Sequence, residues 1–382
     1  MKNAFRRLFP LQALIALILS LIILGQHQGS VYAATTQLSS SQEAKVEDYQ
    51  GLLKEAKWVK FDCENNLTSF TNAAGSEISN KSTDFYIKGI ISPSQFKGFL
   101  DMIDLVCDSY CALLGVTKAP YENEFPFNGK QVRISITEEN RNKNNKPWME
   151  TPGWFYSGNQ QIFWREKDFI ESINNFEKRG EFSDTIMHEL AHYFDDTGMG
   201  DERWCFNKEL FAYLKTCYAM ETALHDTVVR IPSTNRSYKS TRYRTHFLYN
   251  KAKQWYDDDK TKFINMLHVT SSIGPETNPA STKVRENAIA LFLYFSPIID
   301  QAGWGIFEKT FSSYSSSISP TGKQYTGNNE MENRLFDFID RLTFYYKQLD
   351  PEEHPEILLH ADVLEYAIDG GQCLREAFKN KW

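Results

Sequence analysis

Hydrophobic side chains recur at helical spacing in three long stretches of the chain. The first runs from Ser92 or Ser94, the candidate caps, to Gly115, a candidate stop. The second spans residues 183–200, and its apolar face is formed by Ile186, Met187, Leu190, Ala191 and Phe194. The third runs from about Asn207 to about His225. We therefore predict three amphipathic helices, each long enough to pack one side against a core.

A different period appears between the first two helices. Residues Gln131–Thr137 alternate polar and apolar side chains, which predicts a half-buried strand. Residues 153–164 end in Gln161–Trp164, a second candidate strand that follows a turn at residues 157–159. This order of helix, strand, strand and helix predicts an α+β lobe with a small sheet.

The remainder of the chain reads mostly as helix. Residues 34–90 are predicted to be a lead-in segment with one polar helix over Glu47–Val59, and residues 229–382 a mostly helical C-terminal lobe. The strongest candidate helices of that lobe are Tyr243–Tyr256, Lys260–Leu267, Val284–Phe295, Gly303–Tyr314, Glu330–Lys347 and Pro355–Ile368.

The first 33 residues have the layout of a secretory signal. Lys2, Arg6 and Arg7 precede an uncharged, mostly apolar run from Leu11 to Leu24, and Val31-Tyr32-Ala33 offers small residues for cleavage. That run is short for a membrane span, which needs about 20 residues. We expect a secreted, extracellular protein with no stable membrane insertion once residues 1–33 are removed.

Charge and cysteine content narrow the classes of partner. The chain has a net charge of −7, and the signal holds three positive charges and no negative ones, so the rest is more acidic still. This balance argues against nucleic acid or an anionic membrane as partner.

Six cysteines, none in a CxxC pair, suggest disulfides in an exported chain. One pairing, Cys205 with Cys217, would bracket Glu209.

The second helix carries His188-Glu189-Leu190-Ala191-His192. Residues four apart share a helix face, so the two imidazoles can reach one metal ion. Glu189 follows the first of them, where its carboxylate can meet a water in an open coordination position. Ser183 or Asp184 can cap this helix. The alternative interpretation is two hydrogen-bonded histidines on an ordinary amphipathic helix.

Glu209 is the candidate third ligand. It lies near the start of the next helix, 16 residues after His192, and an antiparallel return would bring it to the same ion. A solvated carboxylate favoured by the helix dipole is the competing interpretation. Asp195 and Asp196 are candidates to hold a ligand imidazole by its free N–H.

These residues resemble the gluzincin metallopeptidases, whose third ligand is a glutamate from the following helix. Residues His192–Asp196 and Glu209–Ala212 are similar to the catalytic domain of the anthrax-lethal-factor type, and the helical tail is similar to that of enhancin-like and mucin-degrading secreted peptidases. The resemblance implies a zincin-like catalytic lobe over residues 91–228. It also implies one catalytic Zn²⁺ and a protein or peptide substrate. We expect that substrate to pair with the last strand, Gln161–Trp164, because a late strand commonly takes the edge of the sheet, here beside the second helix.

The implied reaction is endopeptidase hydrolysis of a peptide bond. Zinc would lower the pKa of a water towards about 7, and Glu189 would act as general base. An oxyanion donor is also needed, and Tyr213, His225, Tyr238, Tyr243 and His246 are all candidates. A non-catalytic binding protein on the same scaffold and a zinc hydrolase of a non-peptide bond remain as alternatives.

Overall fold

A computed structural model describes the parts of the chain that form and surround the candidate site, within one compact unit over Val46–Trp382. The described residues are 52, 56–61, 69–71, 77–79, 91–115, 132–137, 152–156, 161–174, 180–197, 207–231, 234, 236–240, 242–267, 278–315, 319–324, 330–349 and 352. The predicted signal and the predicted helix Pro355–Ile368 lie outside them.

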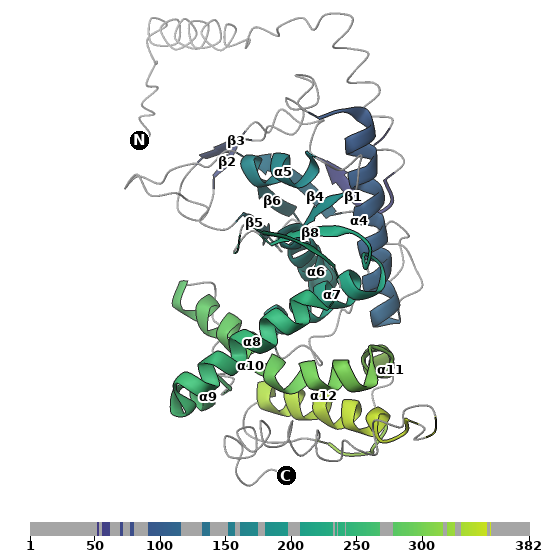
Figure 1. Cartoon of the computed structure of the whole chain (residues 1–382), viewed down its shortest axis with the longest axis vertical. Coiled ribbons are helices and arrows are strands. Elements are labelled where there is room, and N and C mark those ends of the chain that lie inside the picture. The colour runs from purple at the N-terminus through teal and green to yellow at the C-terminus, as the bar shows by residue number, and fades with distance from the viewer. Residues whose placement is uncertain are drawn as a thin grey trace, which may run out of the picture. The chain divides into compact units, whose positions relative to one another are not determined.

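Helix α4 (Pro93–Leu114) confirms the first predicted helix (Figure 1). The Ser92 hydroxyl accepts a hydrogen bond from the Gln95 N–H, and the Gln95 side-chain oxygen accepts one from the Ser92 N–H, so two donors of the first turn are satisfied. Gly115 ends the helix at a φ of 68°, a conformation that glycine adopts at no steric cost. The Tyr110 hydroxyl, buried on α4, donates to the Met187 carbonyl at 2.7 Å and ties α4 to the helix that carries His188 and His192.

The main sheet has four strands in the order β1-β4-β6-β5. Strands β4 (Val132–Thr137) and β6 (Gln161–Arg165) confirm the two predicted strands and pair in parallel. Strand β5 (Gly153–Tyr156) runs antiparallel to β6 and forms the edge of the sheet. The prediction that the last strand lies at the edge is therefore wrong: the chain doubles back within residues 153–164, and the earlier strand of that hairpin takes the edge.

The predicted lead-in segment contributes to this sheet. Strand β1 (Val59–Phe61) pairs in parallel with β4, where the sequence predicted the end of a polar helix. Trp58, only 1% exposed, anchors it, because its backbone N–H donates to Asp104 and its indole N–H to Asp108 on α4. The polar residues in and around Val59–Phe61 hid the strand pattern in the sequence. A short hairpin follows, formed by β2 (Ser69–Thr71) and β3 (Glu77–Ser79).

A second sheet of three strands lies beside the helix that carries His188 and His192. Strand β7 (Glu181–Ser183) runs directly into that helix and pairs in parallel with β8 (Val228–Ile231). Strand β9 (Arg236–Lys239) pairs with β8 in antiparallel fashion. Both later strands fall where the sequence predicted mostly helix, and β8 spans the predicted boundary between the two lobes.

The remaining elements confirm a mostly helical C-terminal half. The predicted helices appear as α8 (Tyr243–Asp258), α9 (Lys260–Leu267), α10 (Asn278–Ala302), α11 (Gly305–Ser312) with the 3-10 turn η1 (Ser313–Ser315), and α12 (Glu330–Tyr346). A short helix, α5 (Glu166–Ile173), follows β6. The protein is thus a mixed α+β structure in which helices predominate.

One buried hydrophobic core runs through these elements. Phe211 of the third predicted helix packs edge-on against Phe311 and Phe338 of the C-terminal helices, so both halves share it. Among the described helices none alone has the length and apolarity of a membrane span; one pair bent by 114°, Thr282–Ala302 with Gly305–Ser312, reaches them only together.

The structure does not form the expected Cys205–Cys217 bridge. Cys217 is a free thiol that is fully buried in the core. Cys107 and Cys111 of α4 are also free and buried. Burial raises the pKa of Cys217 above its usual range, so this thiol stays protonated. Cys63, Cys205 and Cys373 lie outside the described residues.

Candidate metal centre

The two histidines lie on helix α6 (Asp184–Thr197). Ser183 caps its start, because its hydroxyl accepts the Thr185 N–H at 3.3 Å. The apolar face predicted from the sequence is buried, and this burial fixes the rotation of the helix about its axis. His188 and His192 therefore lie one turn apart on the side that faces the next helix.

Glu209 lies in the first turn of that helix, α7 (Lys208–Thr222). Asn207 caps it: the side-chain oxygen accepts the Leu210 N–H at 3.0 Å. The same amide donates to the Asn287 side chain of α10 at 2.7 Å, so the start of α7 is tied to α10. The residue that carries the third candidate ligand is therefore fixed in place by its helix cap.

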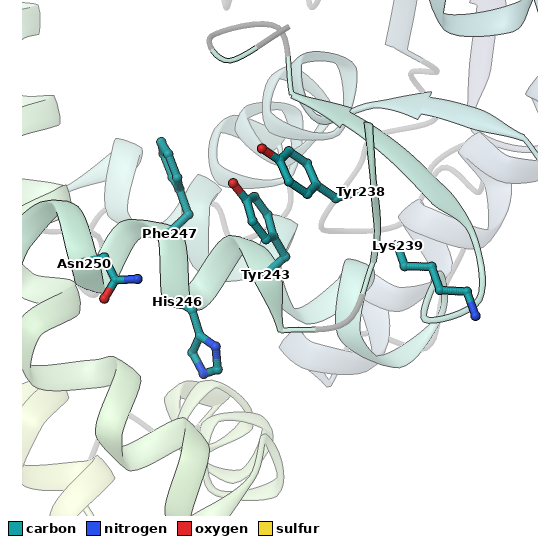
Figure 2. Close-up of a pocket in the computed structure, with 6 residues that line it drawn as sticks. All are labelled: Tyr238, Lys239, Tyr243, His246, Phe247 and Asn250. Carbon is teal, nitrogen blue, oxygen red and sulfur yellow. The ribbon is translucent and has the colours of Figure 1, made fainter. Parts of the chain in front are cut away.

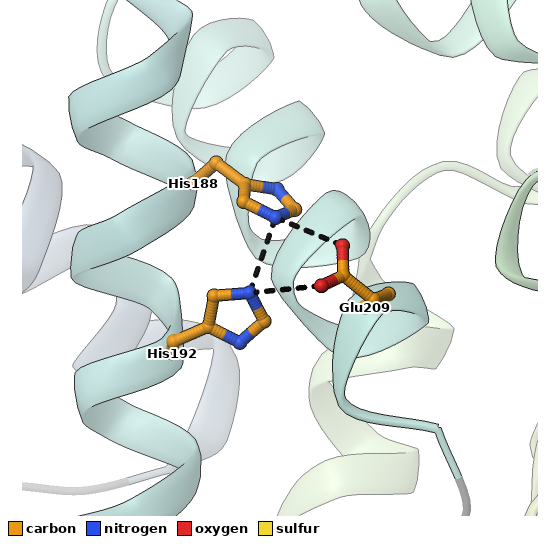
Figure 3. Close-up of side chains that lie close together, drawn as sticks. All are labelled: His188, His192 and Glu209. Carbon is orange, nitrogen blue, oxygen red and sulfur yellow. Dashed lines mark hydrogen bonds and ion pairs between the residues drawn. The ribbon is translucent and has the colours of Figure 1, made fainter. Parts of the chain in front are cut away.

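The three side chains converge on one point (Figure 3). The two Nε2 atoms of His188 and His192 are 3.1 Å apart, and Glu209 places Oε2 3.1 Å from the first and Oε1 3.6 Å from the second. Tetrahedral zinc ligands at about 2.0–2.2 Å from the ion are about 3.4 Å from one another. The donor types and their spacing fit a zinc ion.

The electrostatics of the cluster favour an ionised Glu209. Burial would raise its pKa, but hydrogen bonds and charge from the two histidines outweigh burial and hold the pKa well below its ordinary value. Arg285 of α10 adds a further cation 3.4 Å from Oε2. Nothing near Arg285 in the sequence indicated this role, since it follows Glu209 by more than 70 residues.

Packing fixes the ring of His188. The ring of Tyr213, one turn after Glu209, lies 4.7 Å from it between centroids. The Nδ1 atom of His188 is buried and has no hydrogen-bond partner among the described residues. The side chains of Asp195 and Asp196, the predicted partners for a ligand imidazole, lie outside the described part of the chain.

Glu189 contacts the edge strand. The Phe155 N–H of β5 donates to its Oε2 at 2.7 Å, and the carboxylate is only 7% exposed. Gly153 makes the approach possible, because a Cβ there would lie 3.4 Å from Cγ of Glu189 and 2.9 Å from Cγ2 of Thr185. The backbone donor left no side-chain signal in the sequence, whereas a glycine inside a strand is a recognised mark of close approach.

A cavity of about 980 Å³ opens onto the cluster. His188, Glu189 and Tyr213 all line it. Tyr213 is the predicted oxyanion candidate that the structure brings to this cavity. Burial, with the charge of Glu209, raises the pKa of Tyr213 to about 12, so its hydroxyl remains a hydrogen-bond donor at neutral pH.

The other oxyanion candidates lie elsewhere. His225 has an exposed side chain that pairs with Asp226 at 2.9 Å. Tyr238 of β9 and Tyr243 of α8 stack at 3.7 Å between ring centroids and, with His246, line a neighbouring cavity of about 390 Å³ (Figure 2). The hypothesis that one of these residues contacts the reacting carbonyl is not supported by their positions.

Comparisons with protein-family models, with curated proteins and with solved structures returned no significant match.

Proposed function

We propose that the protein is a zinc-dependent peptidase whose metal ligands are His188, His192 and Glu209. The observation that carries this proposal is the convergence of their three ligand atoms, from two helices, at the spacing of a tetrahedral site. Three protein ligands leave a coordination position open, as in catalytic zinc sites. A lobe of zincin type around α6 and β5 belongs to the same proposal, and so does secretion by way of residues 1–33.

When bound, zinc supplies a Lewis acid that polarises a carbonyl and acidifies water. The chain supplies the proton transfers: Glu189 lines the cavity beside the cluster, where it takes a proton from water and passes it to the leaving amine. The Tyr213 hydroxyl donates a hydrogen bond to the carbonyl oxygen as negative charge develops on it.

Edge strand β5 positions the substrate backbone. The Phe155 N–H points away from β6, because it bonds to Glu189 instead. An extended peptide added to this edge would run past α6 and the metal ligands. The contact between Glu189 and this N–H is then exchanged for contacts with the peptide.

The test combines metal content with cleavage. We expect the full chain to bind one zinc ion per molecule and to cleave a mixed peptide library, and a chelator to stop the cleavage. Glu189→Gln should keep the zinc and lower kcat at least about 100-fold. His192→Ala should lose both, while His225→Ala, which removes an exposed histidine, should lose neither.

Two outcomes would contradict the proposal. Wild-type cleavage by Glu189→Gln would exclude its role as base. Zinc binding without any chelator-sensitive cleavage would favour the alternative, a binding protein built on the same metal site.

A further inference from the structure

The cavity beside the cluster is basic, although the chain is acidic. The chain as a whole has a net charge of −7, but only three acidic side chains line the cavity. The basic side chains of the lining number six: Arg165, Lys167, Arg230, Arg244, Lys251 and Arg285. A cleft with an excess of one sign of charge attracts ligands of the opposite sign.

The arginines of the lining have carboxylate partners within the protein. Arg244 pairs with Asp184 at 3.1 Å and Arg285 with Glu209 at 3.4 Å, while Arg165 pairs with Asp168 and Arg230 with Glu171. These pairs leave Lys167 and Lys251, neither of which forms an ion pair with any described carboxylate. The excess positive charge of the cavity therefore resides on two lysines.

Lys251 is the better placed of the two. It is half-buried in the wall formed by α8, with its Nζ 5.3 Å from the centre of the Trp255 ring. Lys167 is exposed, so its charge is screened by solvent. Burial, followed by the neighbouring charge of Arg244, lowers the pKa of Lys251, and Glu286 only partly opposes this. An anion beside Lys251 would favour its charged form and so offset the effects of burial and of Arg244.

We propose that the cavity selects peptides that carry a carboxylate near the scissile bond, and that Lys251 binds it. The inference rests on the proposed function, because a peptide substrate is what makes a carboxylate the available anion. That carboxylate is either an aspartate or glutamate side chain or the C-terminal carboxylate of the peptide. Both have the same charge and geometry, so the experiment must separate them.

Three matched peptide sets separate the two sources. The first carries Glu or Asp beside varied bonds with an amidated C-terminus, the second carries Gln or Asn instead, and the third combines the neutral sequences with a free C-terminal carboxylate. We expect the full chain with zinc to prefer one carboxylate-bearing set over the second by about tenfold in kcat/KM. The preferred set identifies the source.

Variants of helix α8 test the residue. Lys251→Gln should lose the preference for the carboxylate-bearing set. Lys251→Glu should instead prefer a fourth set, in which Lys replaces the Glu or Asp of the first. Lys253→Gln is the control: it lies on the same helix, pairs with Asp257 at 2.7 Å and does not line the cavity, so the preference should persist.

Equal kcat/KM for all three sets would overturn this inference and leave zinc-dependent cleavage standing. If no peptide is cleaved, the proposed function fails, and fluorescence anisotropy of labelled peptides then decides the charge question. Tighter binding of the carboxylate-bearing peptides, lost in Lys251→Gln, would support the basic site; equal binding would overturn it.

Discussion

Gly153 shows how a single position can control the proposed base. The residue lies on the edge strand where α6 approaches it, and both Thr185 and Glu189 occupy the space that a side chain would need. Its backbone has no unusual φ, so its requirement is for space and not for conformation. Any side chain at this position would therefore act on Glu189 through α6.

Gly153→Ala should destabilise the protein by about 1–3 kcal/mol and lower cleavage, because the new Cβ would lie 2.9 Å from Cγ2 of Thr185. Thr185→Ser removes that methyl group, so the double variant should recover most of the loss. Chemical denaturation of the four proteins measures the coupling, which we expect to exceed about 0.5 kcal/mol. Additive losses would show that the two positions do not conflict.

Side chains of the candidate site differ in how far the sequence could predict them. The spacing of His188 and His192 is a local property of one helix, and the sequence sufficed to place them on a common face. Tyr213 lines the cavity and His225 does not, because of how α7 packs against its neighbours, which is a tertiary property. Arg285 reaches Glu209 only because α10 packs beside α7, and no pattern near it in the sequence carries that information.

Helix α7 joins the candidate metal site to the C-terminal helices. Near its end, Glu221 accepts hydrogen bonds from Thr245 of α8 at 2.5 Å and from the Trp304 indole at the start of α11 at 2.7 Å. Burial raises the pKa of Glu221, and the two hydrogen bonds only partly oppose that rise. One carboxylate thus holds three helices together and does so at an electrostatic cost.

Glu221→Ala should lower the free energy of unfolding by about 1–3 kcal/mol, because it leaves the buried Trp304 donor without an acceptor. Glu221→Gln should keep both contacts, since its amide oxygen accepts from Trp304 and its NH₂ donates to Thr245. Equal losses in the two variants, measured by denaturant unfolding at neutral pH, would mean that the charge and not the hydrogen bonding matters.

The wild type and Glu221→Gln should also differ in how their stability depends on pH. A carboxyl whose pKa is raised in the folded state binds protons more tightly there, so its contribution to stability falls as the pH rises from 4.5, the unfolded value, through the folded pKa. Glu221→Gln cannot titrate and should lack that fall. Unfolding free energies measured at intervals from pH 4 to pH 8 would reveal identical slopes if this assignment is wrong.

Element boundaries were predictable where local signals were strong. Capping residues Ser92 and Asn207 set the starts of α4 and α7 within a residue or two of the prediction. Helix α10 was predicted to stop at Phe295, yet it continues through Pro297 to Ala302, because Ile298 and Ile299 beyond the proline are buried. Core burial there outweighs the lost hydrogen bond.

At the scale of the whole molecule, the sequence predicted the class of fold but not how distant segments pair. Strands β1 and β8 are short, and their partners lie far along the chain, so their pairing depends on long-range packing that no local period records. The consequence for function is direct: β8 pairs with β7, and β7 leads into the helix that carries both histidines.

A metal ion held between α6 and α7 should stabilise the entire unit, because those helices share the continuous core. At a free zinc concentration about 100 times Kd, binding contributes about 2.7 kcal/mol, which corresponds to a rise in Tm of roughly 4 °C. Thermal unfolding of the full chain with zinc and with a chelator measures this difference.

His192→Ala and Glu209→Ala should abolish the zinc response whatever their own Tm, since each protein is compared with itself, and His225→Ala should keep it. A response of wild-type size in the His192 and Glu209 variants would place the zinc elsewhere in the chain, and a wild type indifferent to zinc would remove the ion from the proposed mechanism.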